Sequence, residues 1–205
     1  MANQTVVMAS SRRMILTGRE GAGAIPVATV AAKFQSAMID ARRRLASAIA
    51  LVSAHPVRLN RQQEFTLQFC FNPGILQRGP TFQVIRDVLT PTLEGLQTDD
   101  VEICDPDPNG LPLMAEGYVT SFLGIKGSIH TRFNLGLART TFNLIHEGTH
   151  KFSTTVDPPG GYISANYPAF IATRMAGIFG DINLLDNATA RTNADSFAQF
   201  AMGVT

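Results

Sequence analysis

Two histidines four residues apart, with a glutamate directly after the first, are the residues of this chain best suited to chemistry. The segment reads His146-Glu147-Gly148-Thr149-His150 and holds two of the 4 histidines in the 205-residue chain. Residues four apart lie on one face of an α-helix, so both imidazoles can bind one zinc ion. The glutamate can then act as general base toward a water molecule that the zinc activates. The alternative interpretation is a helix on which both histidines are only polar surface residues.

A third zinc ligand must come from elsewhere, since a catalytic zinc usually has three protein ligands and one water molecule. The chain has no glutamate after Glu147, and neither histidine nor cysteine after His150. Four downstream aspartates remain as candidates: Asp157, Asp181, Asp186 and Asp195. We expect Asp157 to be the ligand because it follows shortly after the predicted helix, and Asp181 is the second choice. The alternative role for Asp157 is ordinary turn chemistry before Pro158.

The elements that position these residues can be predicted from hydrophobic periodicity. Apolar residues recur at steps of three and four from residue 26 to residue 55, which predicts a long amphipathic helix. Further helices are predicted over residues 61–71, 81–96, 137–152, 167–185 and 193–202. Pro91 is expected to bend or split the second of these. Short strands are predicted at residues 5–8, 101–104, 117–123 and 128–133.

This order of elements predicts an α+β fold, rich in helices, with a small sheet beside the helix that carries the two histidines. A strand that runs next to that helix would form one wall of a substrate cleft. Phe133 and Asn134 follow the last predicted strand, and we expect them to align a substrate backbone if that strand lies at the sheet edge.

The composition is typical of one folded domain. Hydrophobic residues make up 45% of the chain and charged residues 16%, so a sizeable core can form. We expect residues 1–25 to form a weakly structured N-terminal arm and residues 26–205 to form a single domain. The net charge of +1 provides no basic field for nucleic acid, and no apolar run is long enough to span a membrane.

The N-terminal 24 residues lack the continuous apolar stretch of a secretory signal. We therefore expect a protein that stays in the cytoplasm, leaves by a signal-independent route, or has lost a leader. Its expected partner is a protein or peptide substrate, and it is expected to be a monomer. Cys70 and Cys104 are expected to be buried free thiols, although export would permit a disulfide. We expect His55 and His130 to be structural or surface residues rather than ligands.

Three segments of the chain resemble one family when they are taken together and in order. Residues 146–150 match a zinc-binding helix. Residues 155–157 match the Thr-x-Asp of a Gly-Thr-x-Asp-x-x-Tyr-Gly signature, and residues 193–201 are similar to a closing Asn-Ala-Asp-Ser-Tyr-x-x-Phe-Ala helix. The chain thus resembles the aspzincin metalloendopeptidases, the family of deuterolysin and the fungal peptidyl-Lys metalloendopeptidases. The resemblance covers roughly residues 130–205.

The resemblance implies a zincin-like fold and one catalytic Zn²⁺ held by His146, His150 and Asp157. It also implies that Glu147 is the general base and that a tyrosine hydrogen-bonds the oxyanion of the tetrahedral intermediate. The chain departs from the signature in two places, because Thr154 and Gly160 replace its first glycine and its tyrosine. Tyr162 is our candidate for the oxyanion donor, and the alternatives are Tyr167 or a purely packing role for Tyr162.

The closing segment bears on specificity. In lysine-specific members of the family, the aspartate of Asn-Ala-Asp and an acidic residue three positions later are thought to hold the substrate's lysine. Asp195 retains the first position, whereas Ala198 occupies the second. The resemblance therefore implies attraction of basic side chains without strict lysine selectivity. The alternative role for Asp195 is a hydrogen-bonded residue that fixes the closing helix.

The function expected from the sequence is a zinc-dependent metalloendopeptidase that hydrolyses peptide bonds inside a chain and favours basic residues at the cleavage site. Two other readings stay open. One is a zinc-binding but catalytically weak module that recognises a partner protein. The other is a structural domain without metal, in which the motif arose by accident.

Overall fold

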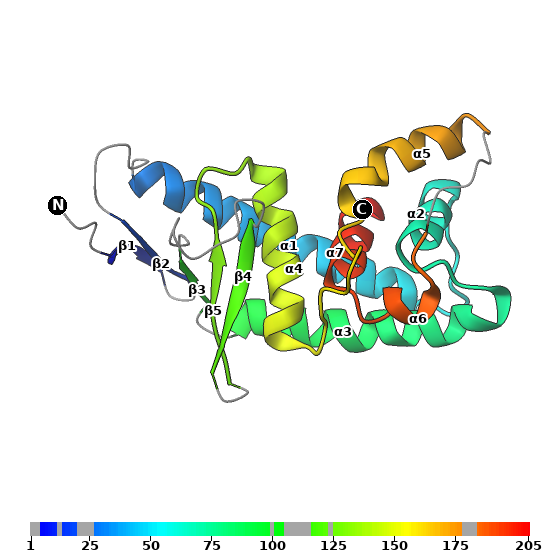
Figure 1. The fold of residues 1–205 in the computed structure, drawn as a ribbon, viewed down its shortest axis with the longest axis horizontal. Coiled ribbons are helices and arrows are strands. Elements are labelled where there is room, and N and C mark those ends of the chain that lie inside the picture. The colour runs from blue at the N-terminus through cyan, green and yellow to red at the C-terminus, as the bar shows by residue number, and fades with distance from the viewer. Residues whose placement is uncertain are drawn as a thin grey trace.

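The computed structural model describes residues 5–11, 14–19, 27–98, 101–104, 116–122, 125–177 and 184–205. This part of the chain is helix-rich and carries one small sheet, which is the α+β arrangement that the sequence predicts (Figure 1). The α-helices are α1 (Val27–Ser53), α2 (Arg61–Phe71), α3 (Arg78–Thr98), α4 (Leu137–Phe152), α5 (Tyr167–Met175), α6 (Asn187–Ala190) and α7 (Ala194–Gly203). Among the described helices, none combines the length and apolar character needed to cross a membrane.

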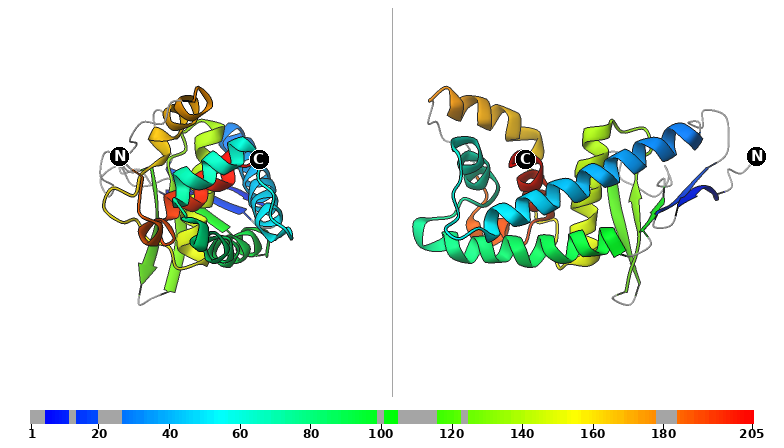
Figure 2. Two further views of the ribbon diagram at one scale, coloured as in Figure 1. Left: turned by 90° about the vertical axis from the view of Figure 1, so that its right-hand side faces the viewer. Right: turned by 180° about the vertical axis from the view of Figure 1, so that it is seen from behind.

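The sheet lies at one end of the molecule, and α2, α5 and α6 lie at the other (Figures 1 and 2). Its strands are β1 (Thr5–Ser11), β2 (Met14–Arg19), β3 (Val101–Cys104), β4 (Gly117–Phe122) and β5 (Ile125–Thr131). Their order is β1-β2-β3-β5-β4. The three inner strands are parallel, and the two outer strands are antiparallel to their neighbours. The edge strand that contacts α4 is therefore β4.

This order changes one prediction about the substrate cleft. β5 is an inner strand, and Phe133 beyond it is 4% exposed. The ring of Phe133 packs edge-on against Phe34 at 5.2 Å between centroids, so this side chain belongs to the core. The edge-strand role predicted for Phe133 and Asn134 is thus wrong, because β4 folds back antiparallel on the outer side of β5.

The N-terminal segment contributes more to the fold than predicted. Only residues 5–8 were expected to form a strand, whereas β1 and β2 pair as an antiparallel hairpin. β2 then pairs in parallel with β3, with Leu16 opposite Ile103. Both side chains are fully buried. Residues 5–11 and 14–19 therefore extend the same sheet that carries β4 and β5.

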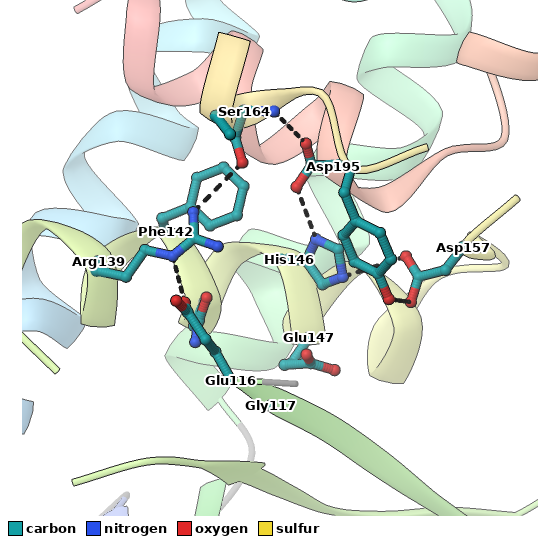
Figure 3. Close-up of a pocket in the computed structure, with 12 residues that line it drawn as sticks. Glu116, Gly117, Arg139, Phe142, His146, Glu147, Asp157, Ser164 and Asp195 are labelled. Atoms are coloured by element: carbon teal, nitrogen blue, oxygen red, sulfur yellow. Dashed lines mark hydrogen bonds and ion pairs between the residues drawn. The ribbon is translucent and has the colours of Figure 1, made fainter. Parts of the chain in front are cut away.

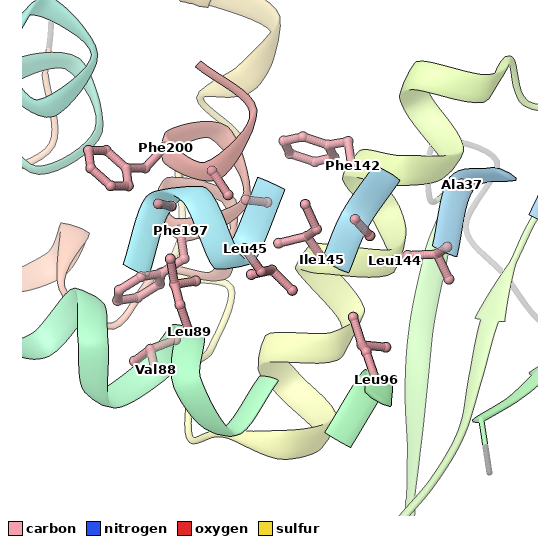
Figure 4. Close-up of a cluster of buried hydrophobic side chains, with 14 of the residues drawn as sticks. Ala37, Leu45, Val88, Leu89, Leu96, Phe142, Leu144, Ile145, Phe197 and Phe200 are labelled. Carbon is pink, nitrogen blue, oxygen red and sulfur yellow. The ribbon is translucent and has the colours of Figure 1, made fainter. Parts of the chain in front are cut away.

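The core is built on α1, which runs the length of the helical part and contacts α3, α4 and α7 (Figures 2 and 4). Its apolar stripe follows the helical period predicted from the sequence. Eight of its residues are at most 3% exposed: Val30, Phe34, Ala37, Met38, Ala41, Leu45, Ala48 and Val52. Leu144 and Ile145 of α4 and Phe197 of α7 are buried in the same cluster. α4 is therefore held between the sheet and the helical core.

Two helices differ from their predicted extents. α3 continues through Pro91 from residue 78 to residue 98, so the proline does not split the helix. Proline has no backbone N–H, so the carbonyl of Asp87, four residues earlier, lacks its helical hydrogen bond. Because Asp87 is exposed, water can hydrate that carbonyl instead. α5 ends at Met175 rather than at residue 185, and Gly177 follows with a positive φ of 78°. Glycine adopts this conformation at little cost. The rest of the predicted helix falls mainly on residues 178–183, outside the described residues.

Candidate metal centre

The two histidines and the glutamate of the motif lie on α4, as the sequence predicts, and their side chains converge. One ligand atom from each of His146, Glu147 and His150 lies within 4.8 Å of the others, so this group could hold a metal ion. The side chains of His146 and His150 are 7% and 13% exposed. Their rings meet nearly perpendicular, with 5.0 Å between centroids. The spacing of four residues thus brings both imidazoles close enough to bind the same metal ion.

Asp157, from the loop that follows α4, lies close to the imidazoles of both His146 and His150; Figure 3 shows its approach to His146. Its Oδ1 lies 3.2 Å from Nε2 of His146, and its Oδ2 lies 3.2 Å from Nε2 of His150. A carboxylate thus faces the two nitrogen atoms that a metal ion would use. Asp186 is exposed, and its carboxylate caps the N-terminus of α6 by accepting from the amide of Thr189. Asp181 lies outside the described residues.

The second ring nitrogen of His150 faces Thr155, whose hydroxyl oxygen lies 3.1 Å from Nδ1. Nδ1 lies 3.0 Å from the carbonyl oxygen of Thr155. If Nδ1–H donates to this carbonyl, Nε2 keeps its lone pair and faces Asp157. Thr155 is buried, and its hydroxyl lies 2.8 Å from the hydroxyl of Thr149 in the last turns of α4. Thr155, which the sequence analysis considered only as part of a signature, therefore supports His150.

The second ring nitrogen of His146 faces Asp195 across the interior of the site. Its Nδ1 lies 3.6 Å from Oδ1 of Asp195, whose side chain is 1% exposed. The other carboxylate oxygen, Oδ2, accepts hydrogen bonds from the amides of Ile163 and Ser164, both at 2.7 Å. The structure thus places Asp195 behind His146, on the opposite side of the ring from Asp157.

The electrostatics of the cluster favour a bound cation. Burial alone would lower the pKa of His146, but the carboxylates of Asp157, Asp195 and Glu147 raise it to about 10 in the protein without metal. Burial would raise the pKa of Asp157, but His146 and His150 hold it well below its usual range. A metal ion could replace the proton that these carboxylates stabilise on His146. Two imidazoles and a carboxylate are also an ordinary donor set for zinc.

Glu147 points from α4 toward the start of β4. Burial raises its pKa to about 7, although the neighbouring His146 and His150 oppose this shift. Its Oε2 is buried and has no hydrogen-bond partner among the described residues. Gly117 lies so close that a Cβ there would come within 2.9 Å of Oε1 of Glu147 and 2.7 Å of the carbonyl oxygen of His130. A residue with a side chain at position 117 would therefore collide with the carboxylate of Glu147, whereas glycine does not.

A cavity of about 530 Å³ opens over this cluster. Its lining comes from the start of β4, from α4, from the loop that carries Asp157 and from α7: Glu116, Gly117, Arg139, Phe142, Asn143, His146, Glu147, Asp157, Tyr162, Ser164, Ala165 and Asp195. The cavity is large enough for a substrate side chain and the peptide group next to it. The predicted site residues are thus all found in, or directly beside, one cavity.

The two tyrosines considered for the oxyanion have different surroundings. Tyr162 is 67% exposed, its hydroxyl lies 3.5 Å from Oδ2 of Asp157, and its ring stacks on His146 at 6.4 Å. Burial of its hydroxyl end and the nearby carboxylates of Asp157 and Glu147 raise its pKa. The hydroxyl of Tyr167 instead lies 2.6 Å from that of Thr66, and its ring packs on Phe69. Tyr162 is therefore the tyrosine that faces the cavity.

The loop with Asp157 and the start of α7 are tied together by hydrogen bonds. Val156 and Asn193 form a parallel bridge, and the amide of Ala194 donates to the carbonyl of Val156 at 3.1 Å. The side-chain amide of Asn193 donates to the carbonyl of Gly161 at 2.8 Å. A Cβ on Gly161 would come within 2.8 Å of the carbonyl of Pro158, so the loop needs glycine there. Residues 155–157 and the start of α7 therefore lie against each other.

Sequence reasoning missed one polar contact across the cavity. Arg139 on α4 pairs with Glu116 just before β4, and its Nη1 lies 3.3 Å from the hydroxyl of Ser164 (Figure 3). Its guanidinium also lies 4.6 Å from the ring centre of Phe142. The only sequence signal for this contact is that Arg139 precedes His146 by seven residues, two turns along the same helix face. Nothing in the sequence marks Glu116 or Ser164.

The remaining candidates lie apart from the cluster. Cys70 and Cys104 are free thiols, as predicted; Cys70 is fully buried, whereas Cys104 is only partly buried, contrary to the prediction. Burial raises the pKa of both. His55 is exposed, and His130 stacks on Tyr118 at 4.4 Å. Neither histidine belongs to the group that could hold a metal.

No protein-family model matches the chain, and no curated protein matches it. Any function must therefore be argued from the arrangement of the residues themselves.

Proposed function

We propose that this protein is a zinc-dependent metalloendopeptidase of the aspzincin type, with a zincin-like fold. One observation supports this most directly: the carboxylate of Asp157 lies 3.2 Å from Nε2 of both His146 and His150. Side chains from α4 and from the loop after it thus converge, as expected if Asp157 is the third ligand. The preference for basic residues at the cleavage site stays a prediction.

The ligand set in this proposal is His146, His150 and Asp157. When bound, zinc supplies a Lewis acid that lowers the pKa of a water molecule and polarises the scissile carbonyl. The carbonyl of Thr155 orients His150 through Nδ1. Three carboxylates around His146 offset the charge of a divalent ion in a buried setting.

Glu147 is the proposed general acid and base. Its carboxylate is buried beside the ligands, and its pKa of about 7 lies close to neutral pH, which is suited to proton transfer in both directions. In this mechanism it takes the proton of the attacking water and then gives it to the leaving amine. The edge strand β4 starts at Gly117 beside Glu147, so an extended substrate could pair with it.

Tyr162 is the proposed donor to the oxyanion. Its hydroxyl lies near Asp157 at the mouth of the cavity, and its raised pKa keeps it protonated at neutral pH. A protonated phenol can donate a hydrogen bond to the negative oxygen that develops in the transition state.

The central experiment combines metal analysis with one isosteric substitution. We expect the purified protein to hold one zinc ion per chain and to cleave unfolded casein. Glu147→Gln should keep zinc but lose cleavage, while Glu94→Gln, an exposed change on α3, should leave both unchanged. Absence of stoichiometric zinc at neutral pH would refute the proposal. Zinc without cleavage by the wild type would favour the partner-binding module instead.

The role of Tyr162 has its own test. Tyr162→Phe removes only the hydroxyl, so kcat should fall by about 100-fold while KM and zinc content stay the same. Tyr167→Phe is the matched control, because its hydroxyl bonds to Thr66 away from the cavity. Equal kcat values for wild type and Tyr162→Phe would assign Tyr162 to packing alone.

A further inference from the structure

We infer that Asp195 is a positioning residue that fixes His146 and the loop around Tyr162 together, rather than a contact for the substrate's side chain. The part of this inference that concerns metal binding rests on the proposed function, because it takes His146 as a zinc ligand. The rest concerns contacts within the chain and does not depend on metal.

The first argument is the burial of the carboxylate. Asp195 is 1% exposed, and it lies in the first turn of α7, where Asn193 caps the helix. An anion is stabilised at the N-terminal end of a helix by the helix dipole. Asp195 lines the cavity, but almost none of its surface is accessible, so a lysine ammonium would find little of this carboxylate to bind.

The second argument is that one oxygen is already engaged. Oδ2 accepts two hydrogen bonds, from the amides of Ile163 and Ser164, each at 2.7 Å. Hydrogen bonds from two adjacent amides to an ionised carboxylate are strong, and they fix the backbone that supplies them. That backbone directly follows Tyr162, which lines the cavity, so Asp195 holds the loop next to this tyrosine. Figure 3 shows the contact between Asp195 and Ser164.

The third argument is the position of the other oxygen. Oδ1 lies 3.6 Å from Nδ1 of His146, which is within ion-pair range. Both atoms are buried and have no hydrogen-bond partner among the described residues. A movement of roughly 0.5 Å would bring them to an ordinary hydrogen-bond distance. A hydrogen bond between these two atoms would therefore satisfy both buried polar groups.

These contacts give Asp195 a defined effect on His146. A histidine that donates Nδ1–H to a carboxylate is held in one orientation and keeps Nε2 as a more basic ligand atom. The Nε2 atom of His146 is the one that faces Asp157. His150 has the equivalent support from the carbonyl of Thr155. Both imidazoles thus have a partner behind them, one from α7 and one from the loop.

Asp195→Asn is the main test, because the amide has the same shape but its nitrogen cannot accept a hydrogen bond from Nδ1–H. We expect zinc affinity to fall by about 10- to 100-fold, measured by competition with a chromogenic chelator. We also expect kcat to fall equally for peptides with lysine or leucine at the cleavage site, with KM little changed. Asp186→Asn, a change to the exposed cap of α6, should alter none of these values.

Two results would overturn the inference. One is wild-type zinc affinity in Asp195→Asn with cleavage lost only at lysine, which would make Asp195 a substrate contact. The other is wild-type affinity with unchanged kcat. Zinc affinity is measured without proteolysis, so a wild type that binds zinc but cleaves nothing would refute the proposed function and leave this inference standing.

A second measurement does not depend on the variant's folding or on zinc. In the wild-type protein, nitrogen-15 NMR of the imidazoles should show a proton on Nδ1 of His146 that exchanges slowly with solvent. The amides of Ile163 and Ser164 should also be strongly protected. A rapidly exchanging Nδ1 proton, or unprotected amides, would contradict the positioning role even if Asp195→Asn fails to fold.

Discussion

The two halves of the candidate site are built in different ways. The helical half consists of His146, Glu147 and His150 on α4, which is packed on the sheet and on α1, α3 and α7. The loop half consists of Asp157 and Tyr162, which lie in an irregular segment after α4. That segment depends on hydrogen bonds to the start of α7 rather than on repeating backbone bonds.

The difference shows where precision comes from in each half. A helix fixes the spacing of its side chains by itself, so two histidines four residues apart need only a packed helix. A loop lacks this regular geometry, so the position of a ligand on it depends on its contacts with neighbouring elements. Perturbing α7 should therefore damage the loop half more than the helical half.

The largest expected effect comes from Phe197→Ala on α7. Phe197 is fully buried and packs 5.1 Å from Phe71, so the cavity left behind should cost about 3–5 kcal/mol in urea unfolding. Hydrogen exchange should rise more at residues 155–164 than along α4. Leu89→Ala is the control, because Leu89 is also fully buried but lies on α3, which packs mainly on α1 and α4. An equal rise in hydrogen exchange at residues 155–164 and along α4 would show that the loop half does not depend on α7 more than the helical half does.

The next effect concerns the metal. Asp157→Ala should weaken zinc binding by more than about 100-fold, because even the loss of a residue behind a ligand costs 10- to 100-fold. The helical half remains, so weak binding by His146 and His150 should persist, and circular dichroism should be unchanged. Asp186→Ala serves as the control. Tight zinc binding by Asp157→Ala would instead move the third ligand to Asp181.

A smaller effect is expected from Asn193→Ala. This change removes both the cap of α7 and the hydrogen bond to the carbonyl of Gly161, and it should cost about 1–2 kcal/mol. It should also speed zinc release, measured after addition of excess chelator. Asp186→Ala removes a cap of similar strength from α6 and should leave the release rate unchanged. Identical release rates in both variants would show that the loop does not depend on Asn193.

The smallest effect lies outside both halves, on the surface of α1. Burial slightly opposes ionisation of Asp40, but the guanidinium groups of Arg44 and Arg43 lower its pKa below 3.8. Its contribution to stability is therefore present above that value and is lost as the pH falls through the lower pKa of the folded state. Asp40→Asn should lose less than about 1 kcal/mol near neutral pH, and the loss should vanish in acid. A change in zinc affinity would contradict the assignment of Asp40 to the surface.

The predicted bounds of α4, residues 137–152, match the structure. Its C-terminal end could be predicted because the proline- and glycine-rich residues 157–161 cannot continue a helix. Asp157 could be chosen because the chain offers no later glutamate, histidine or cysteine. Gly117 could not be predicted, since its importance lies in the atoms it lacks next to Glu147. The edge position of β4 depends on pairing between distant strands, which local patterns do not encode.

Asp195 shows a different limit of sequence reasoning. The sequence left two roles for it, substrate contact or structural support, and both suit an aspartate near a helix start. The choice depends on its distance to His146 and on the two amides that reach its other oxygen. Tyr162 and Tyr167 were separated in the same way, by which hydroxyl faces the cavity and which meets Thr66.

The bridge between Val156 and Asn193 has a consequence for the order in which the site can be made. During synthesis, α4 leaves the ribosome well before α7, and domains fold only when their parts are present. A nascent chain that stops short of Asn193 has its histidines but no support for the loop that carries Asp157. The metal binding and activity proposed for the site would thereby be delayed until Asn193 and α7 have been made.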